Sequence, residues 1–304
     1  MKRIENWRIW AVLEGLTKTV SRTFQHVVGN ASPSLDTTLL SASILGWVQF
    51  VVTGVWAKKR KVALLSPVGM FGSMMFGLFA LISTVLGFIT FMNGGEIATS
   101  TFIVTMAIVP GMIIDIIFFK HKTNVREWIG MCIAILGGWV ILGSPTSGMS
   151  MPLWIWLAIC NSITVAINQG ISQSIKEVDP MFKNFWGGAV TAIGATTALL
   201  IVGQIGLLRY DPSLQKLWLA SVAMGFITIA MWSFNLLSYR QGASIALKKL
   251  VMNATYLITV MVAGILFFGE VLSWQKLISI PLFCVALVLM DKKIWEFITG
   301  GGRK

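Results

Sequence analysis

The 304-residue chain contains few charged residues, few cysteines and few histidines, and each shortage excludes a class of protein. Charged residues make up 12% of the chain, about half of the proportion near 25% that is usual in soluble domains. The three cysteines lie inside apolar runs, which argues against a disulfide framework. His26 and His121 are too few and too far apart in the chain for a metal site. No HExxH pair, phosphate-binding loop or nucleophile motif follows a suitable strand, so we expect neither an enzyme nor a cofactor.

Apolar residues are abundant instead. They make up 56% of the chain, and the mean hydropathy is +0.79, which is typical of a protein that crosses a lipid bilayer several times. No short apolar run with a small-residue cleavage site opens the chain, so we expect the first apolar segment to remain as a span. In a membrane protein the net charge of +12 reports topology, and we expect no nucleic-acid partner.

Apolar runs of about 20 residues, the length that crosses the hydrocarbon core, predict ten transmembrane helices. They cover residues 8–28, 37–57, 67–92, 97–119, 125–143, 152–173, 184–204, 214–237, 243–268 and 274–291. Most of the 24 basic residues then lie in alternate loops, Lys183 among them, whereas the other loops hold only Arg209, Lys216 and Lys276. By the positive-inside rule both termini are cytoplasmic, and we take a bacterial cytoplasmic (inner) membrane as the location.

A small, polar and uncharged linker, residues 143–151, divides the chain into halves of five spans. The halves end similarly, in residues 94–142 and 242–290, with a small-polar lead-in, a long helix, a short polar turn, a Trp and a final helix. An odd number of spans per half inserts the halves in opposite orientations. We therefore expect one all-α membrane domain, residues 1–304, built from two inverted five-helix repeats, residues 1–146 and 147–304.

Taken together, the ten spans, the division into halves, Pro110 within AIVPG and the phe-phe-gly-glu turn 267–270 resemble the drug/metabolite transporter superfamily, in particular its EamA-like branch. Two features depart from that pattern: Lys120 and His121 stand where a Gly-Glu turn is usual, and the ninth predicted helix lacks its usual proline. The resemblance implies the inverted-repeat fold, secondary transport by alternating access, and export of amino acids or related small solutes. Lys249, 20 residues before Gly269, looks like the ninth-helix lysine that contacts anionic substrate groups in nucleotide-sugar transporters of this superfamily.

The first predicted helix carries three charged residues at four-residue spacing: Glu14, Lys18 and Arg22. At about 100° per residue they share one stripe, opposite an apolar face. A charge in the hydrocarbon core costs from about 2.5 to more than 10 kcal/mol, so we expect this stripe to line a polar cavity. The alternatives are an amphipathic helix on the membrane surface, or a Glu14–Lys18 pair that only stabilises the bundle.

Three further helices carry polar or aromatic candidates for the wall of the cavity. Lys249, Asn253 and Tyr256 share a face of the ninth predicted helix, with Lys248 on the neighbouring face. Asn161 and Asn168 align on the sixth predicted helix, and Trp232 lies on the eighth. As alternatives, both lysines could snorkel to the cytoplasmic interface, and the asparagines could form hydrogen bonds that hold neighbouring helices together.

These features favour a secondary transporter, an exporter or exchanger, whose substrate-binding residues are Glu14, Lys18, Arg22, Asn161, Asn168, Trp232, Lys249, Asn253 and Tyr256. Excess buried positive charge favours an anionic or zwitterionic metabolite. The sequence leaves open proton coupling, exchange for a counter-substrate, and assembly as a homodimer. A membrane scaffold is an alternative that predicts no solvent-reachable cavity beside the charged stripe, and a flippase of a lipid-linked substrate is a third.

Overall fold

A computed structural model describes residues 7–64, 66–142, 151–271, 273–290 and 295. These residues form helices and no strand. Residues 143–150 of the linker and six basic residues near the termini, Lys2, Arg3, Lys292, Lys293, Arg303 and Lys304, lie outside the described part of the chain. The helices of the first half are α1 (Trp7–Ala31), α2 (Leu35–Lys59), α3 (Pro67–Met92), α4 (Ile97–Thr105), α5 (Ile108–Phe119) and α6 (Val125–Leu142). Those of the second half are α7 (Leu153–Ser174), α8 (Pro180–Ile201), η1 (Ile205–Leu208), η2 (Pro212–Leu214), α9 (Gln215–Arg240), α10 (Ile245–Phe268) and α11 (Trp274–Met290).

The described chain is an all-α membrane protein, as its composition predicts. Seven helical stretches in the described residues are long and apolar enough to cross a bilayer: Leu35–Lys59, Gly69–Met92, Ile97–Phe119, Leu153–Ser174, Pro180–Ile201, Pro212–Arg240 and Lys248–Phe268. Large apolar side chains such as Phe118 and Leu266 are more than two-thirds exposed on the outside of the bundle. Such a surface suits hydrocarbon rather than water.

The helix expected over residues 97–119 is interrupted, because α4 ends at Thr105 and α5 begins at Ile108. Pro110 has no N–H to donate to the carbonyl of Met106. That carbonyl accepts from the N–H of Val109 at 2.9 Å instead, and the N–H of Ala107 donates to Val104 O at 3.1 Å. These tighter bonds produce a local irregularity in an otherwise continuous 23-residue apolar stretch.

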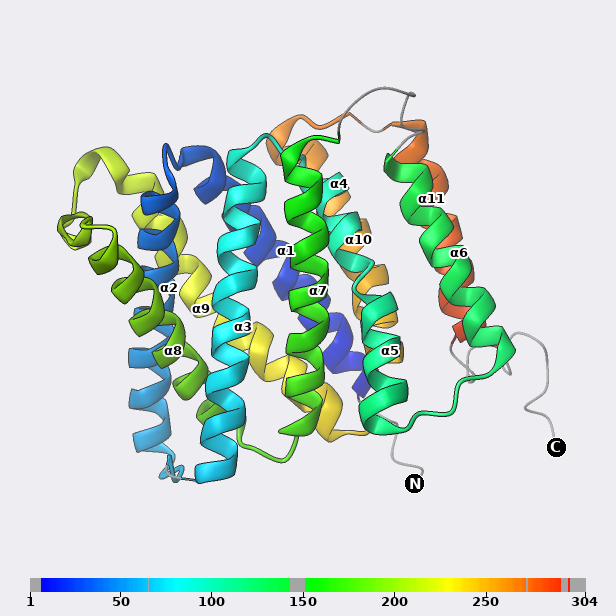
Figure 1. The fold of residues 1–304 in the computed structure, drawn as a ribbon, viewed down its shortest axis with the longest axis horizontal. Coiled ribbons are helices and arrows are strands. Elements are labelled where there is room, and N and C mark those ends of the chain that lie inside the picture. Colours follow the sequence, from blue (N-terminus) through cyan, green and yellow to red (C-terminus); the bar gives the residue numbers. More distant parts are fainter. Residues whose placement is uncertain (1–6, 65, 143–150, 272, 291–294, 296–304) are drawn as a thin grey trace.

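Helices of the first half pair with helices of the second half (Figure 1). α2 packs against α8, α1 against α9, α3 against α7, and α6 against α11, while α10 contacts both α4 and α5. α1 also contacts α3 and α10. Because helices surround α1 on several sides, it packs within the bundle, with Ile9, Leu16 and Val20 exposed on its remaining face, and the alternative of a surface-bound amphipathic helix is wrong.

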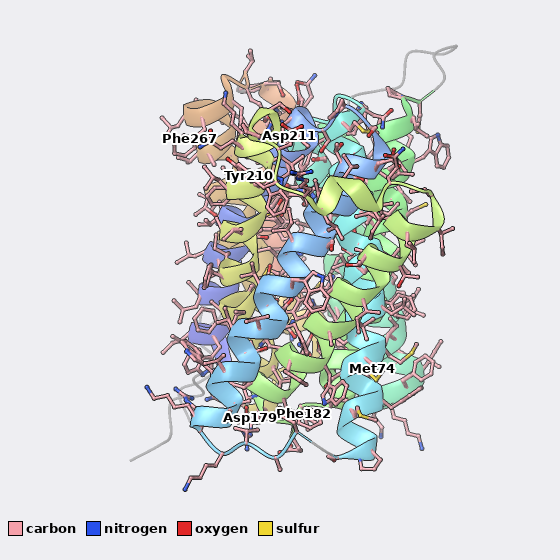
Figure 2. The ribbon with its side chains drawn as sticks, turned by 90° about the vertical axis from the view of Figure 1, so that its left-hand side faces the viewer. Met74, Asp179, Phe182, Tyr210, Asp211 and Phe267 are labelled. Carbon is pink, nitrogen blue, oxygen red and sulfur yellow. The ribbon has the colours of Figure 1, made fainter. Side chains whose placement is uncertain are left out.

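The two ends of the bundle are marked by the start of α8 and by the segment that links α8 to α9 (Figure 2). Asp179 caps α8 by accepting from the N–H of Met181 at 2.7 Å, and Pro180 occupies the first helical position. Tyr210 and Asp211 lie at the opposite end of the bundle. This cap starts α8 four residues earlier than expected, so Lys183 lies in its first turn rather than in a loop, and its assignment as a loop charge is wrong.

Candidate functional site

The charged stripe of α1 faces the centre of the bundle. Glu14 is buried, and its Oε2 lies 2.8 Å from Nζ of Lys248 on α10. Lys248 also donates to Oε1 of Glu14 at 3.1 Å. The ion-pair partner of Glu14 is therefore Lys248, on another helix, and the expected alternative of a local Glu14–Lys18 pair is wrong.

A glutamine and an asparagine extend this ion pair into a network that joins four helices. Gln169 Oε1 on α7 accepts from Nζ of Lys248 at 2.7 Å, from Nδ2 of Asn235 at 2.8 Å and from the hydroxyl of Tyr239 at 2.7 Å. Asn235, on α9, also donates to Oε1 of Glu14 at 3.1 Å. Because both charged groups have several polar contacts, part of the penalty for removing them from water is offset.

Lys183 adds a buried cation to the same network. Its Nζ donates to the hydroxyl of Ser172 at 3.0 Å and to Oδ1 of Asn235 at 2.9 Å. It also lies 3.7 Å from the centre of the Phe76 ring. The side chain is completely buried, so Lys183 meets neutral oxygens and an aromatic face rather than a carboxylate.

Arg22 contacts neutral groups on α1, α3 and α4. Its guanidinium donates to Oε1 of Gln25 at 2.5 Å, to the Ser100 hydroxyl at 3.1 Å and to the Thr101 hydroxyl at 3.2 Å. It also lies over the Phe91 ring, 4.3 Å from the ring centre. Within the described residues, no carboxylate oxygen lies within 4.0 Å of this guanidinium.

Lys18, one turn before Arg22, is partly buried. Its Nζ lies 4.0 Å from the sulfur of Met252 and 5.3 Å from the centre of the Tyr256 ring. No described carboxylate lies within ion-pair distance of this ammonium group either. Two neighbouring cations on α1 thus have no direct anionic partner in the described chain.

A cavity of about 110 Å³ lies among α1, α3, α7 and α9, and these cations form part of its wall. Seven of the nine residues that the sequence predicted for the site border it: Glu14, Lys18, Arg22, Asn161, Asn168, Trp232 and Tyr256. Apolar groups from Leu45, Phe76, Met224 and Met231 share the wall. The α1 side of the cavity thus carries Lys18, Arg22 and Glu14, and these apolar and aromatic side chains come from α2, α3 and α9.

Two predicted residues, Lys249 and Asn253, do not border this cavity. Asn253 Nδ2 donates to the backbone carbonyl of Thr105 at 3.2 Å, beside the interruption between α4 and α5. Lys249 is 1% exposed and experiences the charges of Lys18, Lys248 and Glu14. Because Lys248 and Lys249 are both buried in the bundle, the alternative that they snorkel to the interface is wrong.

Positive charge exceeds negative charge in this part of the bundle. Five basic residues, Lys18, Arg22, Lys183, Lys248 and Lys249, lie in this region with two buried carboxylates, Glu14 and Asp115. Asp115 lies close enough to Tyr239 to act on it electrostatically, and its Oδ1 accepts from the N–H of Ile245 at the start of α10. An excess of buried cations is unfavourable without an anion, so the arrangement favours a negatively charged ligand.

Gln169 and Lys183 are members of the network that helical spacing did not identify. Gln169 directly follows Asn168 and so lies about 100° away from the stripe that the spacing of asparagines defined. Lys183 was assigned to a loop, although the Asp179-Pro180 pair before it is a helix-start signal that could have placed it in a helix. In the described residues, no group of three or more His, Cys, Asp and Glu side chains could hold a metal ion.

Comparisons with known proteins show the fold alone. No protein-family model matches this chain, and no curated protein matches it. Twenty-seven chains of solved structures do match. One of them, described only as "Crystal structure of protein", superposes with a TM-score of 0.66 at 15% sequence identity, covering 94% of this chain and 98% of that chain. Nearly the whole of this chain therefore shares its arrangement of helices with nearly the whole of another protein of known structure.

Proposed function

We propose that this protein is a secondary transporter that carries a small anionic or zwitterionic metabolite, such as an amino acid or a related solute, across the membrane by alternating access. The observation that carries the proposal is the cavity beside α1, whose wall contains Lys18 and Arg22. Neither cation has a carboxylate within ion-pair distance in the described chain. An anionic group of a solute would supply the missing counter-charge.

The size of the cavity suits a small solute. Since one water fills about 10–15 Å³ on this scale, the cavity has room for about seven to eleven water-sized groups. A compact metabolite with a similar number of non-hydrogen atoms would fill it. Trp232, Phe76 and the neighbouring methionines would then contact the apolar part of the solute.

As part of the same proposal, the chain forms ten spans in two inverted repeats and belongs to the EamA-like branch of the drug/metabolite transporter superfamily. The helix pairs support the repeat. If each helix is replaced by its counterpart in the other half, every pair becomes either itself or another observed pair. α2 with α8, α6 with α11, and the α4 and α5 stretch with α10 are pairs of corresponding helices; α1 with α9 and α3 with α7 exchange with each other.

Two carboxylates also support an inverted repeat, because each caps the helix of the other half. Asp115, near the end of α5, accepts from the N–H of Ile245 at the start of α10 at 3.4 Å. Glu270, just after α10, accepts from the N–H groups of Ile97 and Ala98 at the start of α4. Such reciprocal contacts are expected of antiparallel helices related by a two-fold axis in the membrane plane.

The cavity also favours a transporter over a membrane scaffold. A scaffold predicts that the charged residues of α1 pair among themselves with no cavity beside them. Glu14 pairs with Lys248 instead, and Lys18 and Arg22 border open space. We further propose a bacterial cytoplasmic membrane with both termini inside, and coupling either to protons through Glu14 or to a counter-substrate.

The test is uptake and counterflow of a labelled panel of carboxylates, amino acids and neutral solutes in proteoliposomes. We expect saturable transport of an anionic or zwitterionic member. Lys18→Gln and Arg22→Gln should each lower kcat/KM about 10- to 100-fold, because each removes a charge-assisted contact worth about 1.5–3 kcal/mol. Lys216→Gln is the control, since Lys216 is exposed at the start of α9 and does not border the cavity. Transport of neutral solutes alone, or full anion transport in both cavity variants, would refute the proposal.

A further inference from the structure

Two lysines of the described chain have a left-handed backbone conformation. Lys61, directly after α2, has a φ angle of 55°, and Lys120, at the end of α5, has a φ angle of 53°. Among the described residues other than glycine, these two alone have positive φ. The conformation is unfavourable for a residue with a Cβ atom, so glycine is the usual residue where a helix ends in this way.

The turn at Lys61 has the hydrogen bonds of a Schellman motif. The N–H of Val62 donates to Ala57 O at 3.0 Å, and the N–H of Lys61 donates to Lys58 O at 3.2 Å. Three other helices end with the same two bonds and with a glycine of positive φ in the place of Lys61: Gly94 after α3, Gly203 after α8 and Gly242 after α9. Glycine thus forms this turn elsewhere in the chain, and the geometry does not require a lysine.

The turn at Lys120 also has a glycine counterpart in the chain. It is closed by the N–H of His121, which donates to Asp115 O, six positions earlier, at 3.0 Å. A backbone bond over the same number of positions closes the turn after α10, where Gly269, with a φ angle of 65°, stands in the place of Lys120. At both positions, therefore, a lysine is present despite a local energetic cost that glycine would avoid.

Both lysine turns lie where a helix leaves the apolar surface of the bundle. α2 and α5 end at the same end of the molecule, the lower edge in Figure 1. Exposed apolar side chains directly precede each turn, Val55 and Trp56 on α2, and Ile117 and Phe118 on α5. Because such side chains suit the hydrocarbon core and its boundary, the turns that follow them lie at the level of the lipid headgroups.

The two turns carry a concentration of exposed positive charge. Six of their basic residues are exposed: Lys58, Lys59, Arg60, Lys61, Lys120 and Lys122. Within the described residues, no carboxylate oxygen lies within 4.0 Å of any of these six side chains. Their charges are therefore available to an anionic group outside the protein.

We propose that the turns at Lys61 and Lys120 bind the phosphate groups of anionic lipids in the membrane leaflet at this end of the bundle. Phosphate oxygens accept charge-assisted hydrogen bonds from ammonium groups, and basic clusters just outside the hydrocarbon core attract anionic lipids. This contact offsets the backbone cost of a lysine at each turn. The inference does not depend on which solute the protein transports.

A lysine after the last turn of a helix also complements the helix dipole. That effect would stabilise the protein whether or not anionic lipid is present. Lipid binding, in contrast, makes the benefit of Lys61 and Lys120 depend on the lipid. In the absence of lipid, glycine should be at least as favourable as lysine at both positions, because glycine adopts positive φ without strain.

The test uses the full-length protein in a neutral, lipid-free detergent, titrated with phosphatidylglycerol or with phosphatidylcholine of the same acyl chains. Apparent affinities follow from the dependence of the unfolding temperature on lipid concentration. We expect the wild type to prefer phosphatidylglycerol. Lys61→Gly and Lys120→Gly should each weaken its binding about fivefold, and the double variant about 25-fold, with the affinity for phosphatidylcholine unchanged.

Two control variants separate charge from other effects. Lys61→Arg keeps the charge at the same turn and should bind phosphatidylglycerol within about twofold of the wild type. Lys216→Gln removes an exposed charge at the start of α9, away from both turns, and should also leave this affinity unchanged. Without lipid, both glycine variants should unfold at the wild-type temperature or above it.

Three results would overturn the proposal. One is equal affinity of the wild type for the two lipids, or an unchanged affinity for phosphatidylglycerol in the double glycine variant. Another is a lower unfolding temperature of the glycine variants in lipid-free detergent, because the lysines would then serve the fold through the helix dipole. The third is stabilisation of the wild type by inorganic phosphate alone that is lost in the double glycine variant, since the turns would then bind free phosphate rather than lipid.

Discussion

Replacing Lys248 with methionine is expected to destabilise the protein strongly, because the buried carboxylate of Glu14 would lose its ion-pair partner. Glu14 would lose contacts at 2.8 and 3.1 Å and keep only the bond from Asn235 Nδ2 at 3.1 Å. Removing one partner of a buried ion pair typically costs about 3–5 kcal/mol, since the remaining charge loses its direct counter-charge. We expect a loss of this size in the free energy of unfolding for Lys248→Met, and a similar loss for Glu14→Gln.

The double variant Glu14→Gln/Lys248→Met distinguishes this explanation from a general effect of altering the core. With both charges removed, no buried charge is left without its partner. The free energy of unfolding of the double variant should therefore lie within about 2 kcal/mol of that of the wild type. The losses of the two single variants would then be far from additive. Reversible unfolding by denaturant in mixed micelles, followed by tryptophan fluorescence, gives the four free energies of this cycle.

Lys183→Met is the matched control, because Lys183 is equally buried but its direct partners are neutral. The substitution removes hydrogen bonds to Ser172 and Asn235 and also removes a buried charge, so we expect a change of about 1 kcal/mol or less. The reasoning would be refuted if Lys248→Met cost no more than this control. It would also be refuted if the two single losses simply added in the double variant.

Two further predictions concern parts of the protein away from the cavity. Gly46→Ala should lower the free energy of unfolding by about 1–3 kcal/mol, because a Cβ there would collide with the backbone of Ala192 on α8; Gly54→Ala, where the Cβ would meet only an aromatic ring 3.1 Å away, should change it less. The pKa of Glu96 lies below its ordinary 4.5, since burial, which raises it, is outweighed by hydrogen bonds from a threonine and from Lys276. A depressed folded-state pKa means that this contact stabilises the protein above about pH 4.5 and is lost as the pH falls further. Unfolding temperatures measured from pH 7 to pH 3 should therefore fall less steeply in Glu96→Gln than in the wild type, and parallel curves would contradict the prediction.

The sequence by itself predicts the class of protein and which face of α1 points into the bundle. Hydropathy over about 20 residues identifies membrane helices because the hydrocarbon core has a fixed thickness. The 3.6-residue period places Glu14, Lys18 and Arg22 on one face, and the energetic penalty of charge in lipid directs that face inward. The same two arguments explain why Asn161, Asn168, Trp232 and Tyr256 also lie beside the cavity.

Contacts between helices could be decided only by the tertiary structure. Sequence spacing relates a residue to its neighbours three or four positions away, which is why Glu14 and Lys18 looked like a pair. The true partner, Lys248, lies 234 residues along the chain and is brought to 2.8 Å by the packing of α10 against α1. Asn253 likewise meets the Thr105 carbonyl only because α10 lies beside the interrupted helix.

The state of individual buried groups also depended on the fold. Lys183 is an ordinary basic residue near a loop in the sequence, but the cap at Asp179 places it inside α8 and against Ser172, Asn235 and Phe76. Asn161 and Asn168 are alike in the sequence, yet only Asn161 has a serine on the facing helix. Helical periodicity determines which way a side chain points, whereas the neighbouring helices determine what it meets there.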